Sequence, residues 1–91
     1  MPTTPQVKGD PAAGKKVFTG PYGCTGCHTL KDAGATGTVG PNLDQAKPNL
    51  ERVTDRVTHG KGTMPAFGDT NQLTRQQIAD VAAYVVQATG G

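Results

Sequence analysis

The stretch GCTGCHTL, residues 23–30, holds both cysteines of the chain and one of its two histidines. Cys24 and Cys27 lie three positions apart, and His28 follows the second thiol directly. A cluster of this composition can attach haem covalently, bind zinc, or act as a redox-active dithiol. The rest of the sequence has to discriminate among these three chemistries.

The hydrophobic residues of the chain are few and small. Of 91 residues, 34% are hydrophobic; Ala and Val supply most of them, there is no Trp, and Gly and Pro number 13 and 7. Because burial stabilises by roughly 25 cal/mol per Å² of apolar surface, each small side chain contributes little. A single small domain with this composition needs reinforcement from a large apolar cofactor, a metal or disulfides.

Charge and hydropathy exclude several classes of protein. The net charge of +2 is too small for a dedicated nucleic-acid-binding protein. No run of about 18 apolar residues occurs, so we expect no transmembrane segment. The first residues, MPTTPQVKGDP, lack the basic-then-apolar pattern of a signal peptide. We expect residues 1–9 to form a flexible arm or linker and residues 10–91 to form the domain.

Three segments carry the start and stop signals of helices. Asp10 and Pro11 predict a helix start, and this helix should end near Thr19. Asn49 predicts the cap of a second helix, with a left-handed C-terminal cap at Gly60. The third helix, over 75–88, has a capping-box pattern at its start and an apolar stripe at helical spacing.

The remaining segments are rich in glycine and proline. Residues 31–48 and 60–72 lack any periodicity, and we expect both to be loops. No segment alternates convincingly between apolar and polar residues, so no strand is predicted. The sequence therefore predicts an all-α domain with long loops.

Haem attachment would place the His28 imidazole beneath the porphyrin, and the opposite ligand must then come from a distant segment. Met64 lies in an irregular polar loop and precedes Pro65, which favours extended backbone. A thioether in such a loop suits a metal ligand better than a core residue. His59 ends the second helix, where an imidazole can contact free carbonyls. Bis-histidine ligation remains the alternative.

Zinc and dithiol chemistry fit the motif less well. Cys24, Cys27, His28 and His59 supply the four ligands that zinc needs. However, the adjacent side chains of Cys27 and His28 diverge, and no second C-x-x-C or H-x-x-x-H pair exists. A thioredoxin-like dithiol would open a helix within a βαβ pattern, and no strand is predicted beside this motif.

Four segments, in order, resemble the monohaem cytochrome c family of the small soluble bacterial type, and the resemblance covers nearly all of residues 10–91. GCTGCH (23–28) resembles the attachment motif, VGPNL (39–43) the loop after it, and GKGTMPAFG (60–68) the distal segment. The fourth segment is a helix crossing, which would involve Gly14, Phe18, Val81 and Tyr84.

The resemblance implies an all-α cytochrome c fold, in which three to four short helices surround one covalently bound haem c. Cys24 and Cys27 would hold the haem, His28 and Met64 would ligate the iron, and the Pro41 carbonyl would hydrogen-bond the His28 ring. The resemblance further implies a monomeric one-electron carrier rather than an enzyme. Its partners would be redox proteins, a membrane oxidase or reductase among them, and its location periplasmic or otherwise extracytoplasmic.

Two alternative functions stay open at this point. The chain could be a cytochrome c domain cut from a larger oxidase or dehydrogenase, or a haem sensor or enzyme with a labile sixth ligand. The sequence also departs from many relatives, because it has no Trp to bond a haem propionate. The candidates for that role are Asn42, Arg52, Arg56 and Asn71, and the candidates for steering an acidic partner are Lys15, Lys16, Lys31 and Lys61.

Overall fold

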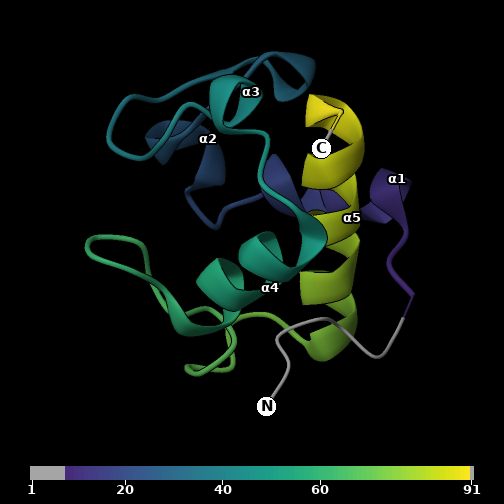
Figure 1. Cartoon of the computed structure of the whole chain (residues 1–91). Coiled ribbons are helices and arrows are strands. Elements are labelled where there is room, and N and C mark those ends of the chain that lie inside the picture. The colour runs from purple at the N-terminus through teal and green to yellow at the C-terminus, as the bar shows by residue number, and fades with distance from the viewer. Residues whose placement is uncertain (1–7, 91) are drawn as a thin grey trace.

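The structure, a computed structural model, describes residues 8–90, which form five helices, one 3₁₀ turn and a two-stranded sheet. Figure 1 shows α5 as the longest helix, with α1 and α4 beside it and α2 and α3 toward its C-terminal end. The elements in chain order are α1 (Pro11–Phe18), α2 (Cys24–Cys27), β1 (Thr29–Leu30), η1 (Lys31–Ala33), β2 (Ala35–Thr36), α3 (Leu43–Ala46), α4 (Leu50–His59) and α5 (Arg75–Thr89).

Helix α1 begins where the sequence predicts. The Asp10 carboxylate accepts a hydrogen bond from the backbone N–H of Ala12, and Pro11 takes the first helical position. Val17 and Phe18 are buried, whereas the two lysines of the last turn are exposed. Of the predicted arm over 1–9, residues 1–7 lie outside the described residues.

Helix α4 is capped by Asn49, whose side chain accepts from the backbone N–H of Arg52 at 2.8 Å. Gly60 follows the helix with a φ of 72°, positive as predicted, but its ψ of 178° is extended and not left-handed helical. The prediction of a left-handed helical cap at Gly60 is therefore wrong, because only φ has the expected sign. The chain turns directly into the next loop, where a Cβ on Gly60 would lie 2.5 Å from the carbonyl oxygen of Met64.

Helix α5 has both hydrogen bonds of a capping box. The backbone N–H of Gln77 donates to the Thr74 hydroxyl at 3.1 Å, and the backbone N–H of Thr74 donates to the Gln77 side chain at 2.8 Å. Gly90 ends the helix in the left-handed conformation, with a φ of 70°. The prediction for this helix is confirmed. Within residues 8–90, no helix is both long and apolar enough to cross a membrane.

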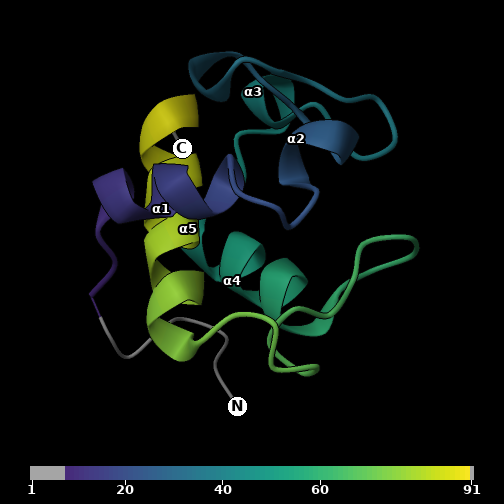
Figure 2. The ribbon, with the colours of Figure 1, turned by 180° about the vertical axis from the view of Figure 1, so that it is seen from behind.

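Helices α1 and α5 cross at close range, and Figure 2 shows α1 passing over α5. A Cβ on Gly14 would overlap the backbone carbonyl of Asp80 and lie 2.8 Å from the Cβ of Tyr84. Beside this contact, the rings of Phe18 and Tyr84 pack at a centroid distance of 5.9 Å. The predicted crossing is confirmed, and the absent side chain at Gly14 makes it possible.

A buried carboxylate adds a polar connection to the same crossing. Asp80 is 7% exposed and accepts from the backbone N–H of Asp10 and from the side-chain amide of Gln76, both at 2.8 Å. Gln76 also donates to the carbonyl of Lys8. These bonds satisfy the carboxylate and hold the start of α1 on α5.

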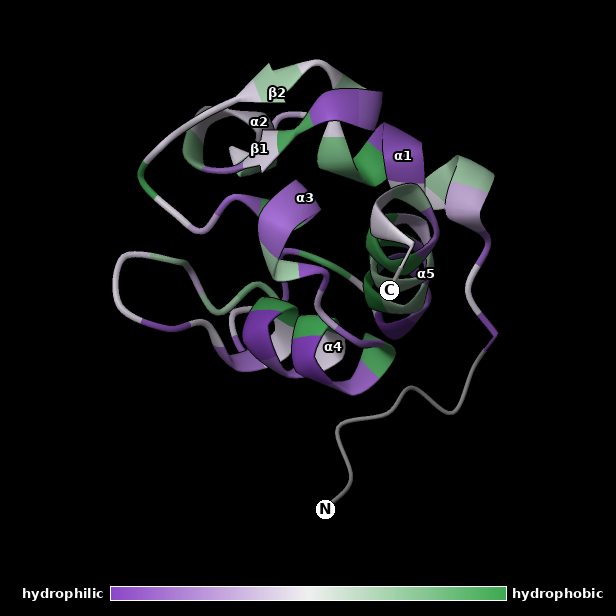
Figure 3. Cartoon of the chain, turned by 45° about the horizontal axis from the view of Figure 1, so that its top comes forward, coloured by the Kyte–Doolittle hydropathy of each residue, from purple (hydrophilic) through white to green (hydrophobic). Residues whose placement is uncertain are grey.

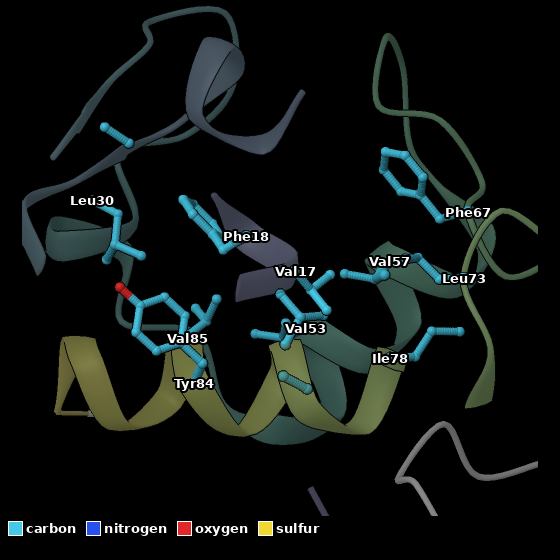
Figure 4. Close-up of a cluster of buried hydrophobic side chains, with 13 residues drawn as sticks. Val17, Phe18, Leu30, Val53, Val57, Phe67, Leu73, Ile78, Tyr84 and Val85 are labelled. Atoms are coloured by element: carbon cyan, nitrogen blue, oxygen red, sulfur yellow. The ribbon is translucent and has the colours of Figure 1, made fainter. Parts of the chain in front are cut away.

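The apolar core lies between α5 and the elements packed against it. In Figure 4, side chains from α1, α4 and α5 lie close to one another, and Phe67 and Leu73, from the loop before α5, extend the cluster. Figure 3 shows hydrophilic and hydrophobic residues on different sides of α4. The buried apolar residues are Val17, Phe18, Leu30, Ala35, Val53, Val57, Phe67, Leu73, Ile78, Ala79, Val81, Ala82, Tyr84 and Val85.

Two predictions about the loops are corrected. The segment 31–48 contains the single-turn elements η1 and α3. With α2 at Cys24–Cys27 as well, the described residues hold five α-helices where three to four helices were expected. Strands β1 and β2 pair in an antiparallel manner, with Thr29 opposite Thr36, although no strand was predicted. Elements of two to four residues show no periodicity, and tertiary bonds such as that from the Lys31 N–H to Asp44 (2.8 Å) hold them.

Candidate functional site

Both thiols lie on α2, a single turn formed by the CTGC segment. Gly23 precedes the turn with a φ of 89°, a conformation that favours glycine. Cys24 and Cys27 are three positions apart and therefore project from the same side of the turn. Both are free thiols and partly exposed, so a planar ligand with two reactive groups on one edge can reach them together.

The environment of the thiols argues against the two alternative chemistries. Burial raises the pKa of the Cys24 thiol to about 11, and the neighbouring Cys27 adds to this shift. Reactive dithiols and zinc sites need an accessible thiolate, which a raised pKa disfavours. In the described part of the chain, no three His, Cys, Asp or Glu side chains gather in a metal-binding group. His59, the fourth residue of the zinc alternative, instead bonds Asp69.

The imidazole of His28 is fixed by the loop that follows the motif. Its Nδ1 lies 2.9 Å from the carbonyl oxygen of Pro41, so Nδ1–H donates and Nε2 keeps its lone pair for a metal. A Cβ on Gly40 would lie 2.6 Å from Cε1 of the same ring. The hydrogen bond expected between His28 and Pro41 is therefore present, and the ring is also confined sterically.

Backbone hydrogen bonds dock this loop onto the motif. The N–H of Gly40 donates to the Cys27 carbonyl at 2.6 Å, and the N–H of Gly37 donates to the His28 carbonyl at 3.1 Å. The Thr29 hydroxyl adds a bond to the Gly37 carbonyl at 2.9 Å. The position of the Pro41 carbonyl thus follows from contacts made by the motif itself.

Met64 lies in the loop between α4 and α5. The backbone groups of Met64 and Lys61 exchange two hydrogen bonds, at 3.0 and 3.2 Å, around Gly62, which has a φ of 59°. Farther along, Phe67 is buried and packs edge-on against Tyr22 with 6.2 Å between ring centroids. The loop that carries Met64 is therefore connected to the segment just before α2.

Several apolar side chains are only partly covered and line the edge of the core. Together with Met64 they come from the segment before α2, from α2, α3 and α4, and from the loop before α5. Two thiols on one side of a turn, an oriented imidazole, a thioether and this apolar edge form the donor set and surroundings that haem c requires, so the residues fit this cofactor. The edge residues are Tyr22, Cys24, Leu43, Leu50 and Met64.

Comparison with known proteins gives consistent results. A model of the family described as "Cytochrome C oxidase, cbb3-type, subunit III" matches residues 9–85. The cytochrome c6 of Rippkaea orientalis is 40% identical over 94 aligned residues, which cover 94% of this chain and 78% of that protein. The cytochrome c6 of Parathermosynechococcus lividus is 41% identical over 91 aligned residues, which cover 90% of this chain and 95% of that protein. The c-type cytochrome SorU of Sinorhizobium meliloti superposes with a TM-score of 0.80 and 46% identity, covering 88% of this chain and 91% of that one.

A helical fold with a C-x-x-C-H turn at its site defines a haem-binding protein, and the comparisons specify the kind. The chain belongs to the cytochrome c family and is a small monohaem electron carrier. Its cofactor is one haem c, bonded through Cys24 and Cys27. The predictions of family, fold, cofactor and electron transfer are confirmed. The roles of His28, Met64 and Pro41 toward the iron stay predictions.

Sequence reasoning missed two side-chain pairs near the site. The Tyr84 hydroxyl donates to Asp32 at 2.6 Å, which ties α5 to η1 and lowers the pKa of the Asp32 carboxyl. His59 was expected to contact the free carbonyls at the end of its helix, but its Nδ1 forms a hydrogen bond with the Asp69 carboxylate. The first pair joins residues 52 positions apart and the second joins residues ten positions apart across a loop, so no helical or strand period signals either of them.

Among the candidates for contacts with propionates, Asn42 and Arg56 have side-chain partners within the chain. The side chain of Asn42 caps α3 by accepting from the N–H of Gln45, and Arg56 bonds Asp55 at 2.9 Å. Asn71 adopts a φ of 60°. None of these contacts tests a bond to a propionate, so that role stays a prediction.

Proposed function

We propose that His28 and Met64 are the two axial ligands of the haem iron, and that the chain carries single electrons between protein partners. The bond of 2.9 Å between Nδ1 of His28 and the Pro41 carbonyl carries this proposal. It commits Nδ1 to donating, which leaves Nε2 as the ligating nitrogen. It also fixes the ring orientation and strengthens the donor character of the imidazole.

The Met64 loop supports the second half of the proposal. Met64 is partly covered and packs against the core, and its backbone is fixed by the turn with Lys61. When bound, haem supplies reversible one-electron chemistry, and the identity of the axial ligands moves its potential over about 0.8 V. A thioether ligand raises the potential. Since both ligands lie on loops held by hydrogen bonds, little of the chain has to move when the charge changes.

With both axial positions filled by this chain, no position remains for a substrate, so we propose that the protein is not an enzyme. We further propose that it acts as a monomer outside the cytoplasm and exchanges electrons with redox proteins, a membrane oxidase or reductase among them. All four candidate lysines are exposed: Lys15, Lys16, Lys31 and Lys61. The Nζ atom of Lys15 also lies 3.6 Å from Oδ2 of Asp32. These cations would steer an acidic partner, and the association rate would then fall as salt increases.

Substitution of Met64 tests the ligand assignment. In the Met64→Ala holoprotein we expect loss of the weak red absorption band of ferric haem with thioether ligation, tight binding of carbon monoxide by the ferrous form, and a lower reduction potential. His59→Gln serves as the matched control and should keep the wild-type spectrum. Absence of this band from the wild type, with an unchanged spectrum in Met64→Ala and a changed one in His59→Gln, would point to bis-histidine ligation instead.

A haem sensor or enzyme with a labile sixth ligand is the second candidate. It predicts that the wild-type ferrous protein itself binds carbon monoxide at neutral pH. The electron-carrier proposal predicts no such binding, so a single titration separates the two functions.

A further inference from the structure

A side-chain pair that the proposed function does not use closes the loop between α4 and α5. Nδ1 of His59 lies 2.9 Å from Oδ2 and 3.1 Å from Oδ1 of Asp69. The two residues are ten positions apart, and Met64 lies midway between them. The pair therefore joins the two ends of the segment that presents the thioether.

The returning half of this segment also lies against the end of α4. The backbone N–H of Asp69 donates to the Thr58 carbonyl at 2.9 Å, and that of Gly68 donates to the Val57 carbonyl at 3.3 Å. A Cβ on Gly68 would lie 2.9 Å from Cα of Thr58. The His59–Asp69 bond thus extends an existing contact to the last residue of α4. Closing a loop reduces the number of conformations it can adopt.

We propose that His59 and Asp69 are positioning residues for Met64, and that the protonated His59 keeps the loop in the conformation in which Met64 ligates the iron. Deprotonation of His59 weakens the pair, so Met64 leaves the iron more readily as the pH rises. The inference rests on the proposed function, because it requires Met64 to be the ligand.

The charges around His59 set the direction of this dependence. Asp69 from the loop and Asp55 from α4 both raise the pKa of His59, and the hydrogen bond with Asp69 is the largest cause. Asp55 is itself bonded by Arg56, and the carbonyls at the end of α4 also favour a cationic imidazole. A raised pKa means that the pair is fully formed below the ordinary histidine pKa of about 6.5. Its contribution is lost as the pH rises through the folded value.

The expected effect is small because both side chains are about half exposed, at 54% and 53%. Exposed pairs change an equilibrium constant only modestly, by about 1.4- to 5-fold. An assay that compares variants at the same pH can measure such a change.

Imidazole binding to the ferric holoprotein provides this assay, since imidazole has to displace Met64. His59→Lys keeps a cation beside Asp69 at every pH of interest and serves as the matched control. Relative to His59→Lys, we expect the wild-type affinity for imidazole to rise about 1.4- to 5-fold between pH 5.5 and 8.5. His59→Gln and Asp69→Asn should have, at every pH, the relative affinity for imidazole that the wild type reaches only at pH 8.5. Because free imidazole titrates in the same way in every sample, its titration cancels when each affinity is divided by that of His59→Lys at the same pH.

Nuclear magnetic resonance of His59 supplies a readout that does not depend on ligand exchange. In Asp69→Asn the pKa of His59 should fall toward its ordinary value. Equal pH profiles of wild type, His59→Gln and His59→Lys, or an unchanged His59 pKa in Asp69→Asn, would overturn the inference. In both cases Met64→Ala should still bind imidazole far more tightly than wild type. If Met64→Ala binds imidazole no more tightly than wild type, the ligand assignment itself fails.

Discussion

The helical frame and the loops of this protein are held in different ways. The frame, formed by α1, α4 and α5, has caps that lie within three residues of each helix start. The loops over 20–49 and 60–74 are held by bonds between segments, such as that from His28 to Pro41. Local signals therefore specify the frame, whereas the loops that carry the site depend on contacts across the fold and on the cofactor.

This difference determines where the chain tolerates a substitution. In the frame, tight packing against backbone leaves no room for an added atom at Gly14. In the part of the chain that carries the site, glycines differ from one another: Gly40 lies against the His28 ring, while a Cβ on Gly26 of α2 would have nothing within 4 Å beyond its own helix and chain neighbours. Three experiments test this contrast between the helical frame and the loops.

Removal of haem should give the largest effect. We expect the chain produced without haem attachment to be largely unfolded. Without haem the partly buried residues at the edge of the core stay exposed to water, and the core itself consists mostly of small side chains. The loss would amount to most of the roughly 5–15 kcal/mol that stabilises a native domain. Near-ultraviolet circular dichroism of the apoprotein measures this. A native-like spectrum would show that the frame folds without its cofactor and would contradict the prediction.

The Gly14→Val substitution tests the frame of the holoprotein. The new side chain meets the Asp80 carbonyl and the Cβ of Tyr84, so the helices have to separate. We expect a loss of about 3 kcal/mol in the free energy of unfolding, at the upper end of values for overpacking. Ala12→Val, at an exposed position of the same helix, should cost less than about 1 kcal/mol. Denaturant titrations with similar midpoints for the two variants would refute the close crossing.

A pair of glycine substitutions tests the loop beside His28. Gly40→Ala places a methyl group 2.6 Å from the imidazole, so the ring or the Pro41 loop has to shift. We expect a loss of about 1–2 kcal/mol, together with a change in the reduction potential. Gly26→Ala should keep the wild-type potential and be neutral or slightly stabilising, as a helical alanine in open space. Equal potentials in wild type and Gly40→Ala would indicate that the ring is free to move.

The sequence predicts the three longer helices well because their signals are local. Asp10, Asn49 and Thr74 each cap a helix at the expected position. The attachment motif is equally local, since its thiols and imidazole fall within five consecutive residues, 24–28. The position of Pro41 beside His28 followed only from the family resemblance.

What could not be predicted depends on contacts across the chain. The pair β1–β2 and the short helix α3 are too short to show a period. His59 looks like a helix-capping residue until Asp69 is brought to it by the backbone bonds after Met64. One signal in the sequence was missed. Asp80 lies next to the apolar stripe of α5, and a buried carboxylate there requires hydrogen-bond donors. The backbone N–H of Asp10, at the start of α1, is one of them.

The Met64 loop leaves α4 at Gly60 and returns to the same helix end at Gly68 and Asp69. Because both ends of this segment bond to the same end of α4, changes around Met64 leave those bonds and the cysteines of α2 in place, provided that Phe67 keeps its position in the core. Variation around Met64 can therefore change the ligand that we propose for the iron, and with it the reduction potential, while Cys24 and Cys27 still hold the haem.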